Sequence, residues 1–300
     1  MPTMRADAMP RGDADAWPDR LDRAAITRYV LGRRTSAGGY CFYRTPQWSV
    51  EEPNAPDTLA ALQSLKLLNT HIPEPRQTAD WLRVLQDESG TYPSLTIGWA
   101  ALRALKVLGG EPKYSPDQWL RSRLENFCDC DGARDWRAAI IEAVHLCELM
   151  HLRYSAIRGS ERDCIAALLD DARSTDGGWA APGSDLETTA MGMHLTQLVN
   201  PHWNPDSLLA VFLGDCEDEH LGLRLAPGAG STSVGALWGG LAVAHVIGRR
   251  LRYPGAVGHQ LVLLQRPDGG LGARHRALSG LRSTWLGLQA ILLLSGLREE

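Results

Sequence analysis

Two aspartates stand where apolar helices are expected to begin, and they are the first side chains in this sequence that could do chemistry. Asp57 opens the segment DTLAALQSLKLL, and Asp135 opens the segment DWRAAIIEAVHLCEL. An acid at a helix start can cap free backbone N–H groups, or it can carry a raised pKa in apolar surroundings and donate a proton. Like charges on two acids across one rim would raise the pKa of one of them and supply a proton donor, whereas the helix dipole favours the ionised form. Asp57 and Asp135 are therefore our general acid/base candidates, with capping as the alternative.

Hydroxyl groups and arginines occupy comparable places. Sliding the apolar helices over one another on their small-apolar pattern places six residues in one column near the helix N-termini: Asp57, Ile97, Asp135, Thr188, Thr232 and Ser283. Arg137 and Arg282 lie in the first turn of two of these helices. Guanidinium groups beside helix N-termini can bind a diphosphate or a carboxylate, or they can be charges that face solvent. The hydroxyls of this column and the two arginines form the predicted polar part of a substrate site.

Aromatic side chains could form its apolar part. Four of the ten tryptophans fall within the apolar helices: Trp99, Trp136, Trp238 and Trp285. Aromatic faces can stabilise a carbocation, or they can fill space between helix layers. Tyr43, which follows the first Gly-Gly turn, is predicted to lie at the rim of the same site.

A repeating pattern of turns and helices must position these residues. Loops with a glycine pair or its remnant recur about every 40–50 residues, which is typical of stacked supersecondary units. Each loop leads into an apolar helix, and more polar amphipathic segments lie between, which indicates an inner and an outer layer. We therefore predict an all-α fold, an (α/α)-barrel of about six helix pairs, as a single domain over residues 18–300, with residues 1–17 as a disordered tail. An open solenoid is the alternative, but such solenoids usually present a polar concave face.

Composition narrows the function classes. The net charge of -4 gives no electrostatic case for nucleic acid. The six cysteines lack metal-site spacing and no secretory leader precedes them, so a cytoplasmic protein with reduced thiols is expected. The stretch between Arg224 and Arg249 carries no permanent charge, but it contains Pro227, His245 and several glycines. We interpret it as a loop and a buried helix rather than as a membrane span.

Three segments resemble a known superfamily. They are GGWAAPGSDLETTAMGMHL, GGY…PDTLAALQSL and GGLGARHRALSGLRSTWLGLQAIL, and the resemblance to the repeats of prenyltransferases and squalene/oxidosqualene cyclases runs from about Leu21 to Leu297. It implies an α/α-barrel with a central, largely apolar cavity that accepts isoprenoid chains.

The catalytic motifs of that superfamily are not matched. The zinc site of protein prenyltransferase β subunits needs an Asp and a Cys two residues apart and a His, and these positions fall on Glu187, Thr189 and Ser283 or Arg282. Without a thiolate or an imidazole there, we predict no zinc site and no such activity. The D-x-D-D acid motif of class II cyclases is approached only by the loop that begins at Asp129, and no D-D-x-x-D motif is present.

Histidines offer a weaker metal hypothesis. Cys147 and His151 share one face of a predicted helix, but no third ligand is evident beside them or His145. His194 lies among Met and Leu residues and is interpreted as a satisfied core histidine.

These observations predict a terpene-cyclase-like enzyme that acts on an apolar, isoprenoid-derived small molecule in a Trp-lined cavity. The reaction would be a cyclisation or an isomerisation by general acid/base catalysis, with no cofactor. One alternative is a non-catalytic barrel that binds a lipid or a protein. Another is an enzyme for an unrelated substrate, such as a natural-product intermediate, a saccharide or a peptide. A partner subunit could complete the site, since prenyltransferase β subunits work beside an α subunit.

Overall fold

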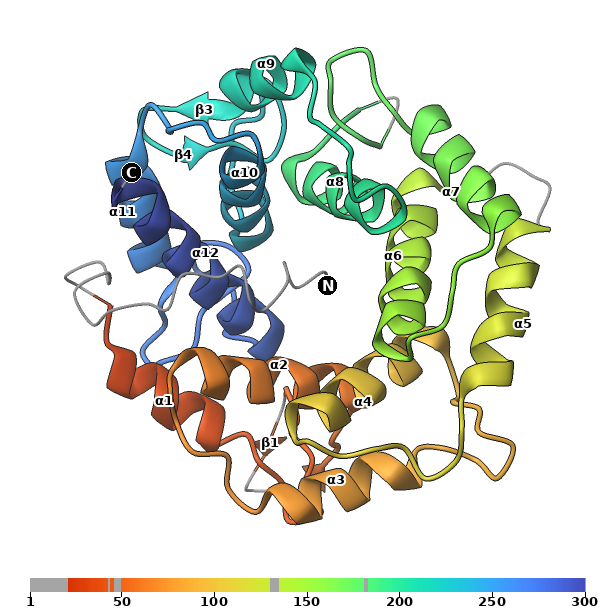
Figure 1. Cartoon of the computed structure of the whole chain (residues 1–300). Helices are drawn as coiled ribbons and strands as arrows, with labels where there is room; N and C mark the ends of the chain where they lie inside the picture. The colour runs from red at the N-terminus through yellow and green to blue at the C-terminus, as the bar shows by residue number, and fades with distance from the viewer. Residues whose placement is uncertain (1–20, 43, 46–49, 130–134, 181–182, 300) are drawn as a thin grey trace.

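The helices form two concentric layers (Figure 1). The computed structural model describes residues 21–42, 44–45, 50–129, 135–180 and 183–299. The inner helices are α2 (Ala55–Leu67), α4 (Leu95–Val107), α6 (Trp136–Leu152), α8 (Leu186–Val199), α10 (Val234–Val246) and α12 (Leu281–Glu299). The outer helices are α1 (Arg23–Leu31), α3 (Pro75–Val84), α5 (Asp117–Cys128), α7 (Gly159–Asp171), α9 (Ser207–Cys216) and α11 (Pro254–Leu264). Each outer helix packs on the inner helix that follows it.

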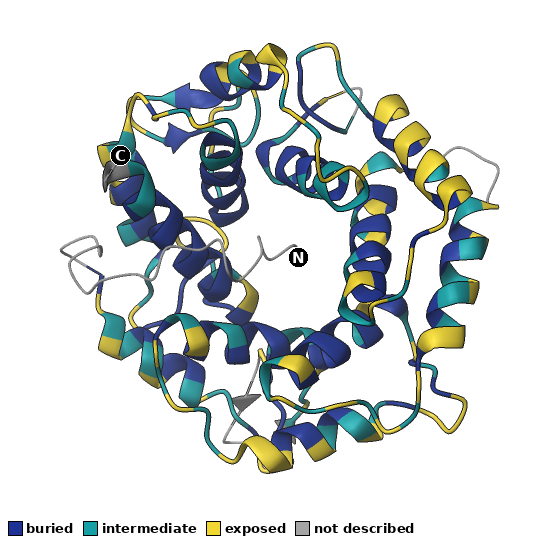
Figure 2. Ribbon diagram, viewed as in Figure 1, coloured by how far each residue is buried: buried dark blue, intermediate teal, exposed yellow. Residues whose placement is uncertain are grey.

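The inner layer is a closed ring. Each inner helix packs against the next one, and α12 returns to pack against α2. The inner helices are buried along most of their length, whereas exposed residues lie mainly on the outer helices and connections (Figure 2). The prediction of an (α/α)-barrel is therefore confirmed, and the open solenoid is wrong.

In the part of the chain that the structure describes, strands form two short antiparallel hairpins within the connections. One pairs β1 (Arg44–Thr45) with β2 (Val50–Glu51), and the other pairs β3 (Glu217–Asp218) with β4 (Gly222–Leu223). The uncharged stretch between Arg224 and Arg249 forms a loop and then α10, as interpreted from the sequence. No helix in the described ranges has the length and hydropathy needed to cross a membrane.

The starts of the inner helices share one capping position. Five residues each accept a hydrogen bond from the backbone N–H three positions on: Asn54, Ser94, Asp135, Asp185 and Ser233. Such caps satisfy N–H groups that have no partner within the helix and each contribute about 1 kcal/mol. Because they recur at equivalent places, they define the register of the repeat.

This register corrects the column inferred from the sequence. Asp57 and Thr188 each stand three residues after their cap, but Asp135 is itself the cap of α6. Thr232 precedes the cap of α10, Ser233. Asp57 and Asp135 therefore do not occupy equivalent positions. The sequence column paired them because the pattern of small apolar residues does not fix where each helix begins.

Backbone hydrogen bonds to three threonines hold the Gly-Gly turns against the inner ring. They run from Tyr40 N–H to Thr58 Oγ1 at 2.9 Å, from Trp179 N–H to Thr189 Oγ1 at 3.1 Å, and from Leu271 N–H to Thr284 Oγ1 at 3.0 Å. All three threonines are fully buried. Gly177 supplies the reversal before one turn with a φ of 92°, and a Cβ there would overlap the Leu208 carbonyl group of α9. The repeats of the sequence are therefore anchoring points between the two layers.

We expect a Thr284→Val variant to lose about 1–3 kcal/mol of folding free energy, because the buried Leu271 N–H would lose its acceptor. Thr96→Val, at an exposed site in α4, should stay within about 0.5 kcal/mol of wild type. Urea unfolding followed by circular dichroism measures both. Equal stability of the two variants would contradict the anchoring role.

Candidate functional site

The anchoring threonines also show which side of each inner helix faces inward. Successive helical residues turn by about 100°, so the fifth residue after an outward-facing threonine points about 140° away from it. That residue is Gln63 on α2, His194 on α8 and Gln289 on α12, and the equivalent on α4 is Arg103. We call this side, turned toward the barrel axis, the axial face.

Glu148 of α6 joins side chains of three inner helices into one cluster. Its Oε2 accepts hydrogen bonds from Arg103 Nη1 at 2.5 Å and from the Trp99 indole N–H at 2.7 Å. Its Oε1 lies 3.1 Å from His194 Nε2. The Glu148 and Arg103 side chains are each 9% exposed, and the His194 side chain is 13% exposed. These contacts join α4, α6 and α8 through polar groups within a largely apolar ring.

Aromatic contacts complete what we call the Glu148 cluster: Glu148, Arg103, His194, Trp99 and His145. The rings of Trp99 and His145 are stacked, with centroids 4.2 Å apart and an interplanar angle of 22°. The Arg103 guanidinium carbon lies 4.8 Å from the Trp99 ring centroid, within the range of a cation–π interaction. Trp99 therefore belongs to a polar site, as well as to the apolar packing of α4.

Electrostatics assign different roles to the members of this cluster. Burial alone would raise the pKa of Glu148, but Arg103 and the hydrogen bond with His194 outweigh it and lower that pKa to about 2. Glu148 is thus ionised at neutral pH and can only accept hydrogen bonds. An ionised acceptor favours the His194 tautomer with its proton on Nε2, which leaves Nδ1 as the nitrogen that can take up a proton. A carboxylate that orients an imidazole in this way is the usual support of a general base.

We expect stability to fall as the pH drops below about 6.5, because of His145. Burial lowers the pKa of His145 from 6.5 to about 3, so the unfolded chain binds the proton first. The contribution of neutral His145 to the free energy of unfolding is complete above pH 6.5. It is lost as the pH falls toward 3, by at most about 1.4 kcal/mol per pH unit. His145→Phe retains a stacking ring without this titration, so its urea midpoint should depend less on pH between 6.5 and 4.5.

The loss of stability at still lower pH comes from carboxylates whose pKa is lowered in the folded chain, Glu148 among them. The pKa of Glu148 falls from 4.5 in the unfolded chain to about 2, so its stabilising contribution is present above pH 4.5 and lost toward pH 2. The His145→Phe variant should therefore still lose stability below pH 4.5. Identical slopes for variant and wild type above pH 4.5 would contradict the assignment to His145.

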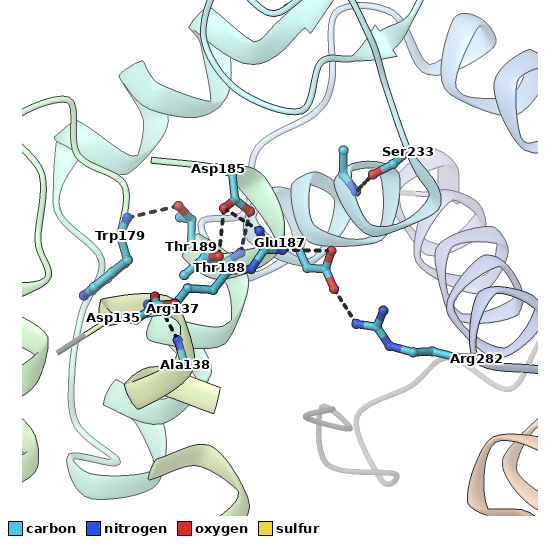
Figure 3. A network of polar contacts seen from close by, with 11 residues as sticks. Asp135, Arg137, Ala138, Trp179, Asp185, Glu187, Thr188, Thr189, Ser233 and Arg282 are labelled. Atoms are coloured by element: carbon cyan, nitrogen blue, oxygen red, sulfur yellow. Dashed lines mark hydrogen bonds and ion pairs between the residues drawn. The ribbon is translucent and has the colours of Figure 1, made fainter. Parts of the chain in front are cut away.

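A second polar network lies at the N-terminal ends of the inner helices (Figure 3). Glu187 Oε1 accepts from Arg282 Nη2 at 2.6 Å, its Oε2 lies 3.5 Å from Arg137 Nη2, and Arg137 Nη1 lies 3.6 Å from Asp185 Oδ2. Arg282 on α12 reaches α8 although α10 stands between them, and a Cβ at Gly235 on α10 would overlap the Glu187 carboxylate. The two arginines predicted to bind an anion thus meet at Glu187, with which an incoming diphosphate would have to compete.

The two predicted acids have other partners. Asp57 Oδ2 accepts from the Phe42 N–H at 2.8 Å and from Asn54 Nδ2 at 2.7 Å, and burial raises its pKa against these hydrogen bonds. Asp135 is exposed and accepts from the Arg137 and Ala138 N–H groups as a helix cap. In the ring, α4 stands between the helices that carry Asp57 and Asp135. The predicted coupling of two acids across one rim therefore has no geometric support.

Asp135 borders a pocket of about 370 Å³ between α5 and α6. The pocket is lined by Arg123, Asn126, Phe127, Asp135, Ala138, Ala139 and Glu142. Ala139 occupies the repeat position of the anchoring threonines, so this pocket opens toward the outer layer rather than toward the barrel axis.

The other predicted contacts are distributed over several environments. Trp238 and Trp285 share the repeat position of Trp99, one residue after that of the anchoring threonines, and are each 2% exposed, whereas Trp136 is partly buried at the start of α6. Thr188 is buried and bonded to Asp185, so it supports the cap. Thr232 Oγ1 has no hydrogen-bond partner in the described part of the chain, and Ser283 is partly buried in the first turn of α12. Tyr43 and the tail over residues 1–17 lie outside the described residues.

Glu148 and Arg103 were missed by sequence reasoning, and His194 was interpreted as a satisfied core residue. The available signal was a charge inside an apolar helix, Arg103 in TIGWAALRALKV and Glu148 in AAIIEAVHLCEL. Such charges are rarely buried unless they are paired. Their pairing could not be inferred, because it depends on the axial offset between neighbouring helices.

The positions of the prenyltransferase zinc ligands do not fit a metal here. Glu187 is engaged by two arginines, and Thr189 faces the turn that contains Trp179. Within the described residues, no group of three or more His, Cys, Asp or Glu side chains is arranged to hold a metal ion.

Comparisons with known proteins agree with this architecture. No family model matches the sequence, and no curated protein matches it. Among solved structures, protein geranylgeranyltransferase-I of Candida albicans, complexed with GGPP, aligns with a TM-score of 0.64 and 13% identity over 92% of each chain. A type II terpene cyclase from Scytonema aligns with a TM-score of 0.57 and 14% identity, over 91% of this chain and 96% of the cyclase. A glycosidase in complex with glucose aligns with a TM-score of 0.51 and 13% identity, over 95% and 98%. At these identities the likeness shows the fold: this chain has the α/α-barrel that prenyltransferases and terpene cyclases also have.

Proposed function

We propose that this protein is an enzyme that moves a proton on an apolar, isoprenoid-derived substrate inside the barrel and so cyclises or isomerises it. His194 is the proton carrier, and Glu148 orients it. The observation that carries the proposal is the Glu148 cluster, in which a nearly buried imidazole is bonded to an ionised carboxylate on the axial face. No zinc takes part in the proposed reaction.

The chemistry of the cluster narrows the reaction. Glu148 is held ionised by Arg103 and His194, so it cannot serve as the strong acid that protonation of an ordinary alkene requires. The His194 imidazole, held by the Glu148 carboxylate, is suited to proton transfers that need a weaker acid or base. It can protonate an epoxide, remove a proton from a carbocation, or shift a proton next to an electron-withdrawing group. We therefore favour a substrate with one such activated position.

The surroundings favour an apolar substrate. Inner-ring residues are predominantly aliphatic and aromatic, and the Trp99 ring packs within the cluster against His145 and Arg103. The fold likeness to proteins that handle isoprenoids supports the same substrate class. All the groups named in the reaction come from this chain, so the proposal does not require a second subunit.

Glycoside hydrolysis is a weaker candidate for the same barrel. It usually uses two carboxylates that flank the scissile bond, no more than about 9.5 Å apart. Among the described residues, Glu187 is a second carboxylate on the axial face, and it precedes His194, the partner of Glu148, by seven residues or roughly 10 Å of helical rise on α8. It is also bound to Arg282. This pair does not suit a glycosidase.

The proposal is tested by turnover. Purified protein is incubated, with a chelator present, with neutral isoprenoid alcohols, their epoxides and a prenyl diphosphate, and the products are analysed by gas chromatography and mass spectrometry. Cyclisation and isomerisation conserve mass, so we expect a product isomeric with its substrate. Binding of one of these compounds without any product would instead favour the non-catalytic barrel.

A further inference from the structure

Gln289 is a buried amide in the middle of α12 for which the described structure provides no hydrogen bond. The residue is 1% exposed, and neither Nε2 nor Oε1 has a partner among the residues that the structure describes. Its neighbours on the same side of the helix, Leu286 and Leu293, are aliphatic and buried. A buried amide without partners destabilises a protein, whereas a leucine of similar size would not. The fold itself therefore gives no reason for a glutamine at this position.

The location of Gln289 suggests a reason. Thr284 faces the outer layer, because its Oγ1 accepts from the Leu271 N–H, and Gln289 follows it by five residues. Gln289 thus lies on the axial face, at the same repeat position as His194 on α8. The intervening helix, α10, presents Ala242 at this position, so only a small side chain stands between the two walls. Gln289 and His194 therefore occupy equivalent positions on two walls of the barrel interior, where the proposed substrate would lie.

The chemistry of the amide limits what it can bind. It offers one carbonyl acceptor and one NH2 group with two donors, and it carries no charge. A hydroxyl group can donate to the carbonyl and accept from the NH2, which satisfies both ends. A carbonyl or an ether would satisfy only the NH2, and an anion among aliphatic side chains would lack a compensating charge.

We propose that Gln289 is a substrate-binding residue that recognises a neutral hydroxyl group, so that the substrate is a hydroxylated isoprenoid rather than a diphosphate or a plain hydrocarbon. This inference rests on the proposed function for the location of the substrate. It adds the class of polar group that fixes the substrate's orientation relative to His194.

The test is binding, measured by isothermal titration calorimetry, with farnesol, farnesyl diphosphate and the hydrocarbon farnesene as probes. Geraniol and geranylgeraniol serve as shorter and longer homologues. Wild-type protein should bind one of the alcohols about tenfold or more tightly than farnesene, and more tightly than the diphosphate. In Gln289→Leu this preference should fall to about the level of the hydrocarbon, while the affinity for farnesene stays the same or rises.

The matched control is Gln63→Leu, the same substitution at the same repeat position on α2, where the side chain is only partly buried. It should retain the preference for the alcohol. Without ligand, Gln289→Leu should also melt at a higher temperature than wild type, whereas a structural role of the amide would lower that temperature.

Three results would overturn the inference. They are an unchanged preference for the alcohol in Gln289→Leu, tighter binding of farnesyl diphosphate than of any alcohol by wild type, and no binding of any alcohol up to its solubility limit. Alcohol binding that depends on Gln289, without turnover, would support this inference while removing the enzymatic function. Turnover with an unchanged alcohol preference in Gln289→Leu would support the enzymatic function while removing this inference.

Discussion

A Glu148→Leu variant is expected to lose about 3–5 kcal/mol of folding free energy, the largest effect that we expect of a single substitution in this protein. Arg103 and Glu148 are each 9% exposed and lie 2.5 Å apart. Removing one partner of such a pair leaves the other charge buried without its compensating carboxylate, which costs far more than the net contribution of the pair itself. The measurement is equilibrium unfolding in urea at pH 7.

The double variant Arg103→Met, Glu148→Leu separates the cost of the unpaired Arg103 charge from the net contribution of the ion pair. Replacement of a whole buried pair by apolar residues of similar volume is often neutral or stabilising, so the second substitution should restore most of the lost stability. Equal loss in the single and the double variant would mean that packing, and not the buried charge, determines the effect. It would also remove the electrostatic account of how Glu148 is kept ionised.

A His194→Asn variant is expected to lower turnover by about 10²–10⁴-fold, the usual contribution of a positioned acid/base group. The shorter amide can still bond to Glu148, so the variant should remain folded. The matched control is His259→Asn on α11, where the histidine is exposed and far from the ring interior. The readout is the rate of formation of the isomeric product. A rate within a factor of about two of wild type would exclude His194 as the proton carrier.

The architecture was predictable because its signals are local. A glycine-rich turn, a capping side chain and an apolar helix recur in each repeat, and Asp185 with Thr188 and Thr189 gives one of the clearest examples. Alternation of polar and apolar helices then specifies the two layers. These features depend on neighbouring residues in the chain, so one sequence is enough to reveal them.

The site was less predictable because it depends on the axial offset between neighbouring helices. Glu148 stands thirteen residues after its cap, Asp135, whereas Arg103 and His194 each stand nine after theirs, yet the three side chains meet. No repeat alignment would place them together. The same uncertainty in axial position led to the pairing of Asp57 with Asp135, which the caps of α2 and α6 correct.

The most direct test of the central claim is chemical rescue of a His194→Ala variant. Truncation removes the imidazole, so formation of the isomeric product should fall at least about 100-fold, and added imidazole should restore part of that rate by carrying the proton in its place. The control is Glu148→Gln, which keeps the His194 imidazole and should gain nothing from added imidazole. A His194→Ala variant that keeps its full rate, or one that stays inactive in imidazole although it binds substrate like wild type, would contradict the claim.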